Sequence, residues 1–189
     1  QVLLTHDDLR NRRRYLNARA TLLELLRLDA IPVVNENDTV SVDELKLGDN
    51  DNLAAFVAAL VDADLLLIAS DVPGLYTANP RSDPLARPVD EVAEVGESIL
   101  AMAGGAGSVI GTGGMATKLQ AAAKAAGAGI QTVLFDGTDA DALRLMAHGT
   151  VRGTLVRASL SRLAARKHWL RHAPSAPGAI LVDAGAARA

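Results

Sequence analysis

The chain has 189 residues, of which 49% are hydrophobic and 3% aromatic, enough for one α/β domain with an aliphatic core and the beginning of a second. A net charge of −3 and a pI near 5.8 exclude a general attraction to nucleic acid or to anionic membranes. The absence of cysteine excludes disulfides and thiolate zinc sites.

The first predicted element is a helix that begins after Thr5. Thr5 and Asp8 have the spacing of a capping box, in which a hydroxyl and a carboxylate satisfy free backbone amides. Apolar residues then recur at helical spacing, opposite an arginine-rich face, and they are Leu9, Leu16, Ala20, Leu23 and Leu26. The arginines could bind RNA, but the acidic chain favours a solvated helix face.

Residues 31–34 (IPVV) predict a buried strand that ends in a polar cluster, residues 35–38 (NEND). A loop then leads to a second polar cluster, residues 49–52 (DNDN), and to an apolar helix over residues 53–60. If the two clusters share a sheet edge, their amides and carboxylates could grip a carboxylate substrate or orient a catalytic lysine. Asp49 or Asn50 could instead simply cap the helix.

The clearest strand covers residues 64–69 (DLLLIA), and its continuous apolar run predicts burial on both faces. The strand leads to Ser70 and Asp71, whose hydroxyl and carboxylate could reach a ribose or a base, or could initiate a turn. Proline, glycine, asparagine and aspartate then predict a long loop over residues 72–88.

A predicted helix over residues 96–102 is followed by a glycine-dense segment and a helix over residues 116–126. In residues 111–118 (GTGGMATK) the glycines let backbone amides approach a polyphosphate, and Lys118 adds a charge for a transferring phosphoryl group. The spacing is not that of a Walker A loop. Besides a phosphate-binding loop, the segment fits a loose dinucleotide fingerprint, with Asp136 as a candidate ribose ligand. A third interpretation is an ordinary loop followed by a helix cap.

A buried strand over residues 132–135 and a helix capped by residues 138–141 and running to residue 148 complete the pattern. Alternating strands and helices predict an α/β domain with a mostly parallel open sheet, helices on both faces, and ligands at the carboxyl ends of the strands. We expect this domain to cover residues 1–156, a basic linker to cover 157–176, and residues 177–189 to begin a small β domain. The histidines do not have metal-like spacing, so no metal site built from protein ligands is predicted.

Four of these segments resemble, in order and spacing, the signature segments of the glutamate 5-kinase family. They are residues 33–38 (VVNEND), 48–53 (GDNDNL), 70–81 (SDVPGLYTANPR) and 111–118 (GTGGMATK). That family belongs to the amino acid kinases, whose fold is a three-layer α/β/α sandwich. The segment at 70–81 recurs in related amino acid kinases, so the first two segments carry the more specific resemblance.

The resemblance implies an enzyme that phosphorylates the γ-carboxylate of L-glutamate with ATP and Mg²⁺, the first step of proline biosynthesis. It also implies a cytoplasmic homo-oligomer, dimer or tetramer, that proline inhibits. Alternatives are a kinase acting on N-acetylglutamate or aspartate, and a nicotinamide-dependent oxidoreductase. No apolar run approaches the roughly 20 residues of a transmembrane helix, so no membrane partner is expected, nor is nucleic acid.

Carried over by residue, the resemblance implies that Asp38 and Asn50 contact glutamate and that Asp51 orients the catalytic lysines. Ser70 and Asp71 would contact the nucleotide. The ATP site would be lined by Thr112, Gly113, Gly114, Met115, Ala116, Thr117 and Lys118, with Lys118 stabilising the transferred phosphoryl group.

Family members also carry features in a region that precedes the match to Gln1. These features are another catalytic lysine, a glycine-rich phosphate loop and a substrate-contacting serine. Residues 178–183 (GAILVD) resemble the start of the family's C-terminal PUA domain. We therefore expect the 189-residue chain alone not to turn over.

Overall fold

The computed structural model describes residues 1–37, 39–40, 50–103 and 114–159. In chain order, the described elements are β1 (Val2–Leu4), α1 (His6–Arg10), α2 (Arg12–Arg27), β2 (Val34–Glu36), α3 (Asn50–Leu60), β3 (Leu65–Ser70), β4 (Glu91–Val92), α4 (Glu97–Ala103), α5 (Met115–Gly127), β5 (Gln131–Asp136), α6 (Ala142–Ala147) and β6 (Thr154–Val156). Within these ranges no helix is long and apolar enough to cross a membrane.

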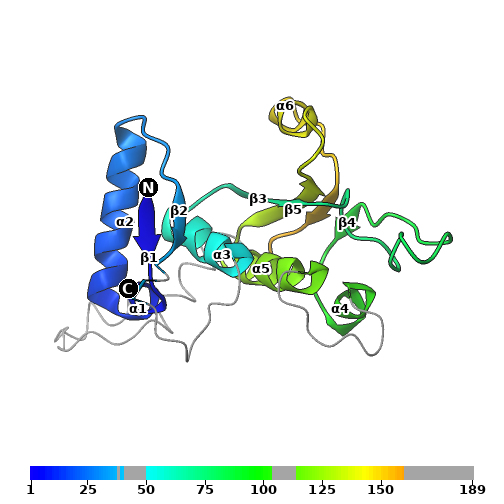
Figure 1. The fold of residues 1–189 in the computed structure, drawn as a ribbon, viewed down its shortest axis with the longest axis horizontal. Coiled ribbons are helices and arrows are strands. Elements are labelled where there is room, and N and C mark those ends of the chain that lie inside the picture. The colour runs from blue at the N-terminus through cyan, green and yellow to red at the C-terminus, as the bar shows by residue number, and fades with distance from the viewer. Residues whose placement is uncertain (38, 41–49, 104–113, 160–189) are drawn as a thin grey trace, which may run out of the picture.

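The described strands form two sheets (Figure 1). The larger has the order β3-β5-β6-β4, in which β3 and β5 run parallel from Leu65 opposite Gln131 to Ser70 opposite Asp136. β4 is parallel to β6, and β6 is antiparallel to β5. β1 and β2 form a separate parallel pair. The predicted α/β fold with mostly parallel strands is therefore confirmed, with β6 as the antiparallel exception.

Helices pack on both faces of the larger sheet around β5. On one face, α3 and α5 bury small and aliphatic side chains against β3 and β5. The main contributors are Ala55, Ala58, Leu66, Ile68, Leu119, Ala121, Ala122, Ala125 and Leu134. On the other face, α6 packs through Ala142 on Val133 and Phe135, and Figure 1 shows it on the side of the sheet opposite α3 and α5. Each fully buried leucine in such a core contributes about 1.5–3 kcal/mol.

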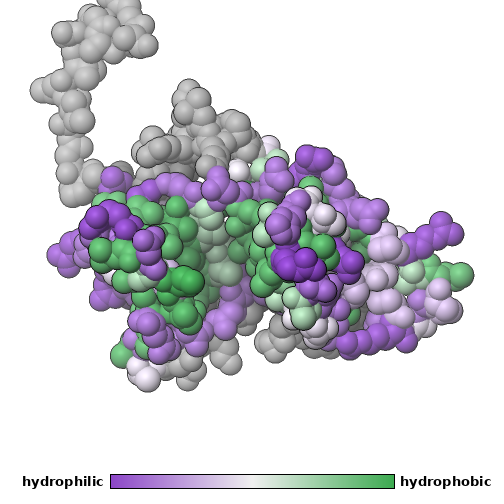
Figure 2. Space-filling model, turned by 90° about the horizontal axis from the view of Figure 1, so that it is seen from above, coloured by the Kyte–Doolittle hydropathy of each residue, from purple (hydrophilic) through white to green (hydrophobic). Residues whose placement is uncertain are grey.

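The prediction that strand 64–69 is buried on both faces is wrong for the described chain. Leu66 and Ile68 are buried, but Leu65 and Leu67 on the opposite face are 43% and 37% exposed. The reason is that α3 and α5 cover one face, while α6 packs on β5 and β6 rather than on β3. Figure 2, which views the molecule from the α6 side, shows that apolar residues also gather at the surface on the side where α2, β1 and β2 lie.

The strand predicted at residues 31–34 also differs from the structure. Ile31 is 89% and Val33 64% exposed, and regular pairing begins only at Val34, beside β1. A strand is buried only where neighbouring elements cover it. The two-stranded sheet of β1 and β2 has few such neighbours, so Ile31 and Val33 stay largely exposed. β1 itself, a three-residue strand, was not predicted.

The capping box predicted at the first helix is confirmed. The Asp8 carboxylate accepts from the Thr5 amide at 2.7 Å, and the Thr5 hydroxyl accepts from the Asp8 amide at 3.3 Å. The continuous helix that was expected is divided, however. Asn11 adopts an extended conformation and its side chain accepts from the amides of Arg13 and Arg14, which starts α2 as a new helix.

The buried face of α2 also differs from the predicted one. Leu22 is fully buried, whereas Leu16 and Leu26 of the predicted apolar face are each 45% exposed. Arg19, predicted to lie on a solvated face, pairs with Asp62 just after α3. The predicted orientation of the helix is therefore wrong, because periodicity groups residues on one face but does not show which face the neighbouring elements cover.

Candidate active site

The chain connectivity brings the first turns of α3 and α5 to the same edge of the larger sheet. Each helix is followed after a short connection by a strand, α3 by β3 and α5 by β5, and each helix packs on that sheet. A helix that returns to the start of the next strand begins near the strand's carboxyl end. The carboxyl edge of a parallel sheet is where ligands bind in open α/β folds.

At this edge Lys118 and Asp51 form an ion pair. The Lys118 Nζ atom lies 3.0 Å from Oδ2 and 3.1 Å from Oδ1 of Asp51. The two side chains are only 14% and 15% exposed. Such a charge-assisted contact is stronger than a neutral hydrogen bond and fixes the position of the ammonium group. The arrangement supports the predicted role of Asp51 in orienting a catalytic lysine, which stays a prediction.

Thr117 joins the same cluster. Its hydroxyl oxygen lies 3.1 Å from Asp51 Oδ2 and 2.7 Å from the carbonyl oxygen of Gly114. A hydroxyl has one proton to donate, so Thr117 can donate to only one of these two acceptors at a time. The predicted nucleotide residue is thus also a neighbour of the carboxylate, which its sequence position did not reveal.

The N-terminus of α5 carries most of the predicted nucleotide residues. Gly114 is its N-cap in an extended conformation and offers no side-chain oxygen to the first amides of the helix. No atom of the described residues lies within 4 Å of the position where a Cβ of Gly114 would lie. Met115 and Ala116 follow in the first turn, partly buried. A helix start of this kind suits an anion, whereas Thr112 and Gly113 lie outside the described residues.

Ser70 and Asp71 lie at the carboxyl end of β3, but they are not in contact with Lys118 in the described part of the chain. The Ser70 hydroxyl donates to Asp71 Oδ1 at 3.4 Å, and Asp71 Oδ2 lies 2.8 Å from an Arg81 nitrogen. The hydrogen bond from Arg81 lowers the pKa of the Asp71 carboxyl below its ordinary value. Arg81 comes from the long predicted loop and was not expected at this position.

Of the two residues predicted to contact glutamate, the structure describes one. Asn50 is exposed at the start of α3, and Asp38 lies outside the described residues. Asn50 also lines a groove of about 320 Å³ beside α3. The rest of its lining is apolar and consists of Pro32, Val34, Leu53, Ala54, Val57, Ala58 and Leu66.

Thr154 ties the loop that carries Arg81 to the sheet. Its buried hydroxyl accepts from the Leu75 amide at 2.8 Å and donates to the Val89 carbonyl at 2.6 Å. These two partners lie near opposite ends of the loop. A lone threonine in a short strand gives no sequence signal for such a role, so reasoning from the sequence missed it.

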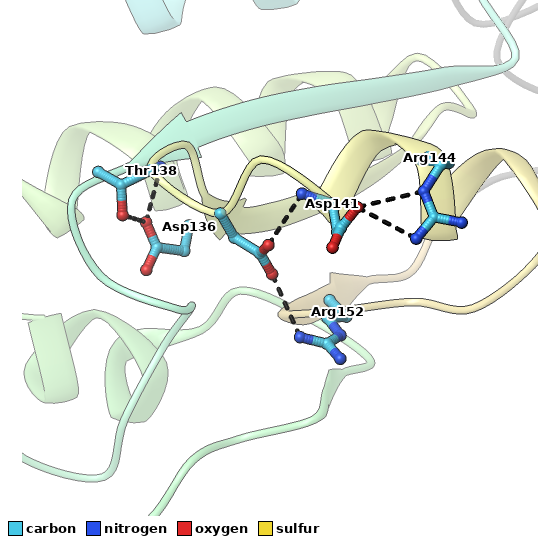
Figure 3. A network of polar contacts seen from close by, with 6 residues as sticks. Asp136, Thr138, Asp141, Arg144 and Arg152 are labelled. Carbon is cyan, nitrogen blue, oxygen red and sulfur yellow. Dashed lines mark hydrogen bonds and ion pairs between the residues drawn. The ribbon is translucent and has the colours of Figure 1, made fainter.

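Asp136, the candidate ribose ligand of the dinucleotide interpretation, is engaged in its own turn (Figure 3). Its Oδ1 atom accepts from the amide and the hydroxyl of Thr138 at 2.8 and 2.6 Å. The predicted cap at residues 138–141 is confirmed in part. Asp141 is the N-cap of α6, but its carboxylate pairs with Arg144 and makes no capping bond. The Asp139 carboxylate instead accepts from the Asp141 amide at 3.0 Å. Within the described ranges no three acidic, histidine or cysteine side chains are grouped to hold a metal ion.

The amino acid kinase family model matches residues 1–136, more than half of the chain. The chain belongs to the amino acid kinase family. The match covers α3, β3, α5 and β5, and hence the Lys118–Asp51 cluster. Neither this family nor the relatives described next favour the dinucleotide interpretation.

Within the amino acid kinase family, the chain is similar along its whole length to proteins named glutamate 5-kinase. It is 71% identical over 189 residues to the one from Xanthomonas campestris pv. campestris (strain 8004), of which it covers 52%. It is 65% identical to the one from Xylella fastidiosa (strain 9a5c), of which it covers 49%. The chain therefore spans about half the length of the curated relatives it matches.

Solved structures of phosphotransferases share the amino acid kinase fold. A UMP kinase from Bacillus anthracis superposes with a TM-score of 0.55 at 15% identity, covering 75% of this chain and 52% of that one. An isopentenyl phosphate kinase gives a TM-score of 0.51 at 22% identity, covering 72% and 50%. At these identities the likeness shows the fold alone, and it confirms the α/β class predicted from the sequence.

Proposed function

We propose that a full-length enzyme carrying this chain transfers the γ-phosphoryl group of ATP to the side-chain carboxylate of L-glutamate, forming glutamyl 5-phosphate. The observation that carries the proposal is the Lys118–Asp51 ion pair at the start of two adjacent helices. It occurs in a chain that is 71% identical throughout to a protein named glutamate 5-kinase. Helix N-termini favour anions, so the lysine lies where a phosphoryl group would be stabilised.

In this reaction one oxygen of the γ-carboxylate attacks the γ-phosphorus of ATP in line. The bond from that phosphorus to the oxygen bridging to the β-phosphate breaks, and ADP leaves. The carboxylate is already a nucleophile, so no general base is required. Catalysis then consists of positioning the reactants and neutralising charge on the phosphoryl oxygens. Lys118 supplies positive charge, and Asp51 holds its ammonium group in place.

The remaining predicted residues have supporting roles in this proposal. Asn50 and Asp38 contact glutamate, and Ser70 and Asp71 contact the nucleotide. Residues 112–118 surround its phosphates. Magnesium would enter with ATP, held chiefly by phosphate oxygens and water, because this ion usually takes few protein ligands.

The proposal extends to the biological setting. The reaction would be the first step of proline biosynthesis, carried out in the cytoplasm by a homo-oligomer that proline inhibits. These points rest on likeness to the named relatives alone. Light scattering of the full-length protein and a proline titration of its activity test them directly.

The function itself is tested by ADP release from Mg-ATP in the presence of L-glutamate, N-acetylglutamate or aspartate. We expect release with glutamate and background rates with the other two. Release with N-acetylglutamate or aspartate instead would keep the kinase chemistry and change the substrate. A folded full-length protein that releases ADP with none of the three would refute the proposal.

A further inference from the structure

A second lysine of α5 contacts α3 close to the Lys118–Asp51 pair. The Lys124 Nζ atom lies 2.5 Å from Oδ1 of Asn52, and 5.4 Å from the centre of the Phe56 ring. Asn52 directly follows Asp51 and is buried, with 9% of its surface exposed. Lys124 is seven residues after Thr117, so the two lie on the same face of α5.

The rest of the interface between α3 and α5 consists largely of alanine. Ala55 and Ala58 of α3 and Ala121, Ala122 and Ala125 of α5 are at most 4% exposed. Methyl groups allow close packing, but they form shallow ridges and grooves that resist sliding or rotation less than larger side chains do. The register of the two helices therefore depends on polar contacts across the interface as well as on the packing of each helix on the sheet.

Two such contacts hold the helices at separate points. Asp51 pairs with Lys118 near the helix starts, and Asn52 pairs with Lys124 further along α5. During phosphoryl transfer, the Lys118 ammonium must share its charge with the phosphoryl oxygens, which weakens its hold on Asp51. The contact of Lys124 with Asn52 and Phe56 involves neither Lys118 nor Asp51.

We propose that Lys124 is a positioning residue: through Asn52 and Phe56 it fixes α5 against α3 and thereby sets the geometry of Lys118 for phosphoryl transfer. This inference rests on the proposed function. A misplacement of about 1 Å at a reacting group can lower a rate about 100-fold. A small shift of α5 against α3 that leaves the Lys118–Asp51 pair in place should lower the rate by a smaller factor.

The test uses three variants of a full-length enzyme that carries this sequence. Lys124→Met keeps the length of the side chain and removes its charge, and Lys124→Arg keeps a cation that can still contact the amide and the ring. Arg157→Met is the matched control, because it removes an exposed cation that pairs with Glu91 away from the site.

We expect Lys124→Met to lower kcat about tenfold while KM for ATP and glutamate changes by less than about twofold. Lys124→Arg should restore kcat to within about twofold of wild type, and Arg157→Met should leave it unchanged. An unchanged kcat in Lys124→Met would overturn the proposal. So would an equal loss in Lys124→Met and Arg157→Met, since that would reflect general destabilisation.

A second readout does not depend on turnover. Acetylation of lysine amines in the folded protein, followed by peptide mass spectrometry, reports how well Asp51 protects Lys118. Labelling of Lys118 should rise about threefold or more in Lys124→Met and stay at the wild-type rate in the other two variants. If wild type does not phosphorylate glutamate but this pattern appears, the proposed function fails and the positioning role survives. Unchanged labelling of Lys118 in Lys124→Met would overturn the positioning role even in an active enzyme.

Discussion

Substituting Lys118 by methionine in a full-length enzyme that carries this sequence separates two roles of the Lys118–Asp51 pair. At 3.0 Å and an effective dielectric constant of about 20, the two charges attract each other by about 5.5 kcal/mol before desolvation is counted. Desolvation offsets much of this attraction. Lys118→Met, however, leaves the Asp51 carboxylate only 15% exposed and without its cation. We expect the free energy of unfolding to fall by about 3 kcal/mol, the lower end for a broken buried pair.

The same substitution also removes the positive charge of the Lys118 ammonium, which in the proposed reaction stabilises the phosphoryl group during its transfer. Loss of one such contact typically lowers kcat about 10²–10³-fold, which corresponds to about 3–4 kcal/mol in the activation free energy. The KM for glutamate should change little, because the ammonium acts on the phosphoryl group rather than on the bound carboxylate substrate.

The double variant Lys118→Met with Asp51→Asn distinguishes the two roles. It removes both charges and leaves an amide oxygen that can still accept from Thr117. Urea unfolding followed by circular dichroism should show stability restored to within about 1 kcal/mol of wild type. The rate of ADP release should remain as low as in Lys118→Met. Recovery of turnover together with stability would show that Lys118 acts only through folding, and the reasoning would be refuted.

Three further substitutions test individual contacts. Thr117→Val removes the hydroxyl beside Asp51 and should lower kcat about fivefold with a stability loss near 1 kcal/mol, whereas Thr117→Ser should behave as wild type in ADP release and urea unfolding. Burial raises the pKa of Asp8, but hydrogen bonds from Thr5 outweigh this effect and leave the pKa below 3.8. The ionised Asp8 carboxylate therefore stabilises the folded state above pH 3.8, and this stabilisation is lost as the pH falls through the pKa of Asp8 in the folded protein. The difference in unfolding free energy between wild type and Asp8→Asn should therefore be about 1 kcal/mol at neutral pH and vanish in acid; a difference independent of pH would contradict this. Thr154→Val leaves two buried backbone groups without their partner and should lower the free energy of unfolding by about 2 kcal/mol, while Thr154→Ser should lose much less; equal losses in a urea titration would assign the effect to packing.

Long periodic segments were predicted closely. The helix expected over residues 116–126 is Met115–Gly127, and the one expected over 96–102 is Glu97–Ala103. Glycines near the ends of both helices, and the helix-forming alanines within Met115–Gly127, indicate these bounds in the sequence itself. The strands Val2–Leu4, Glu91–Val92 and Thr154–Val156 were missed, because two or three residues are too few to show a period.

The short strands depend on partners far away in sequence. Gly153 has a φ of +131°, and a Cβ built there would lie 2.0 Å from the carbonyl oxygen of Leu134 in β5. β6 can therefore approach β5 only because residue 153 is glycine. The sequence shows that glycine but not the strand it must lie against, so the antiparallel pairing could not be inferred.

Burial failed as a prediction for a related reason. Leu65 and Leu67 are apolar, which favours their burial. Whether they are buried depends on which elements cover that face of β3. The buried face of α2 failed as a prediction because periodicity shows which residues share a face, but not which face the neighbouring elements cover: Leu22 is buried, while Leu16 and Leu26 are exposed. In both cases the elements that cover a face lie outside the segment in which the periodicity is measured.

Predicting the Lys118–Asp51 pair would have required both the positions of the two residues in the sequence and the packing of the two helices that carry them. The positions of the two residues, each in the first turn of a helix that precedes a strand of the parallel sheet, indicate that they lie at one edge of the sheet. That Lys118 meets Asp51 rather than another nearby acid depends on the phase and separation of α3 and α5. Helix axes lie about 8–10 Å apart depending on the side chains between them, and alanine favours the short end of that range. Alanines that in the sequence indicate only helix propensity therefore bring the two helix starts close enough for a contact of 3.0 Å across 67 residues of sequence. By this argument, enlarging the interface at Ala121 or Ala55 should separate Lys118 from Asp51 without touching either residue.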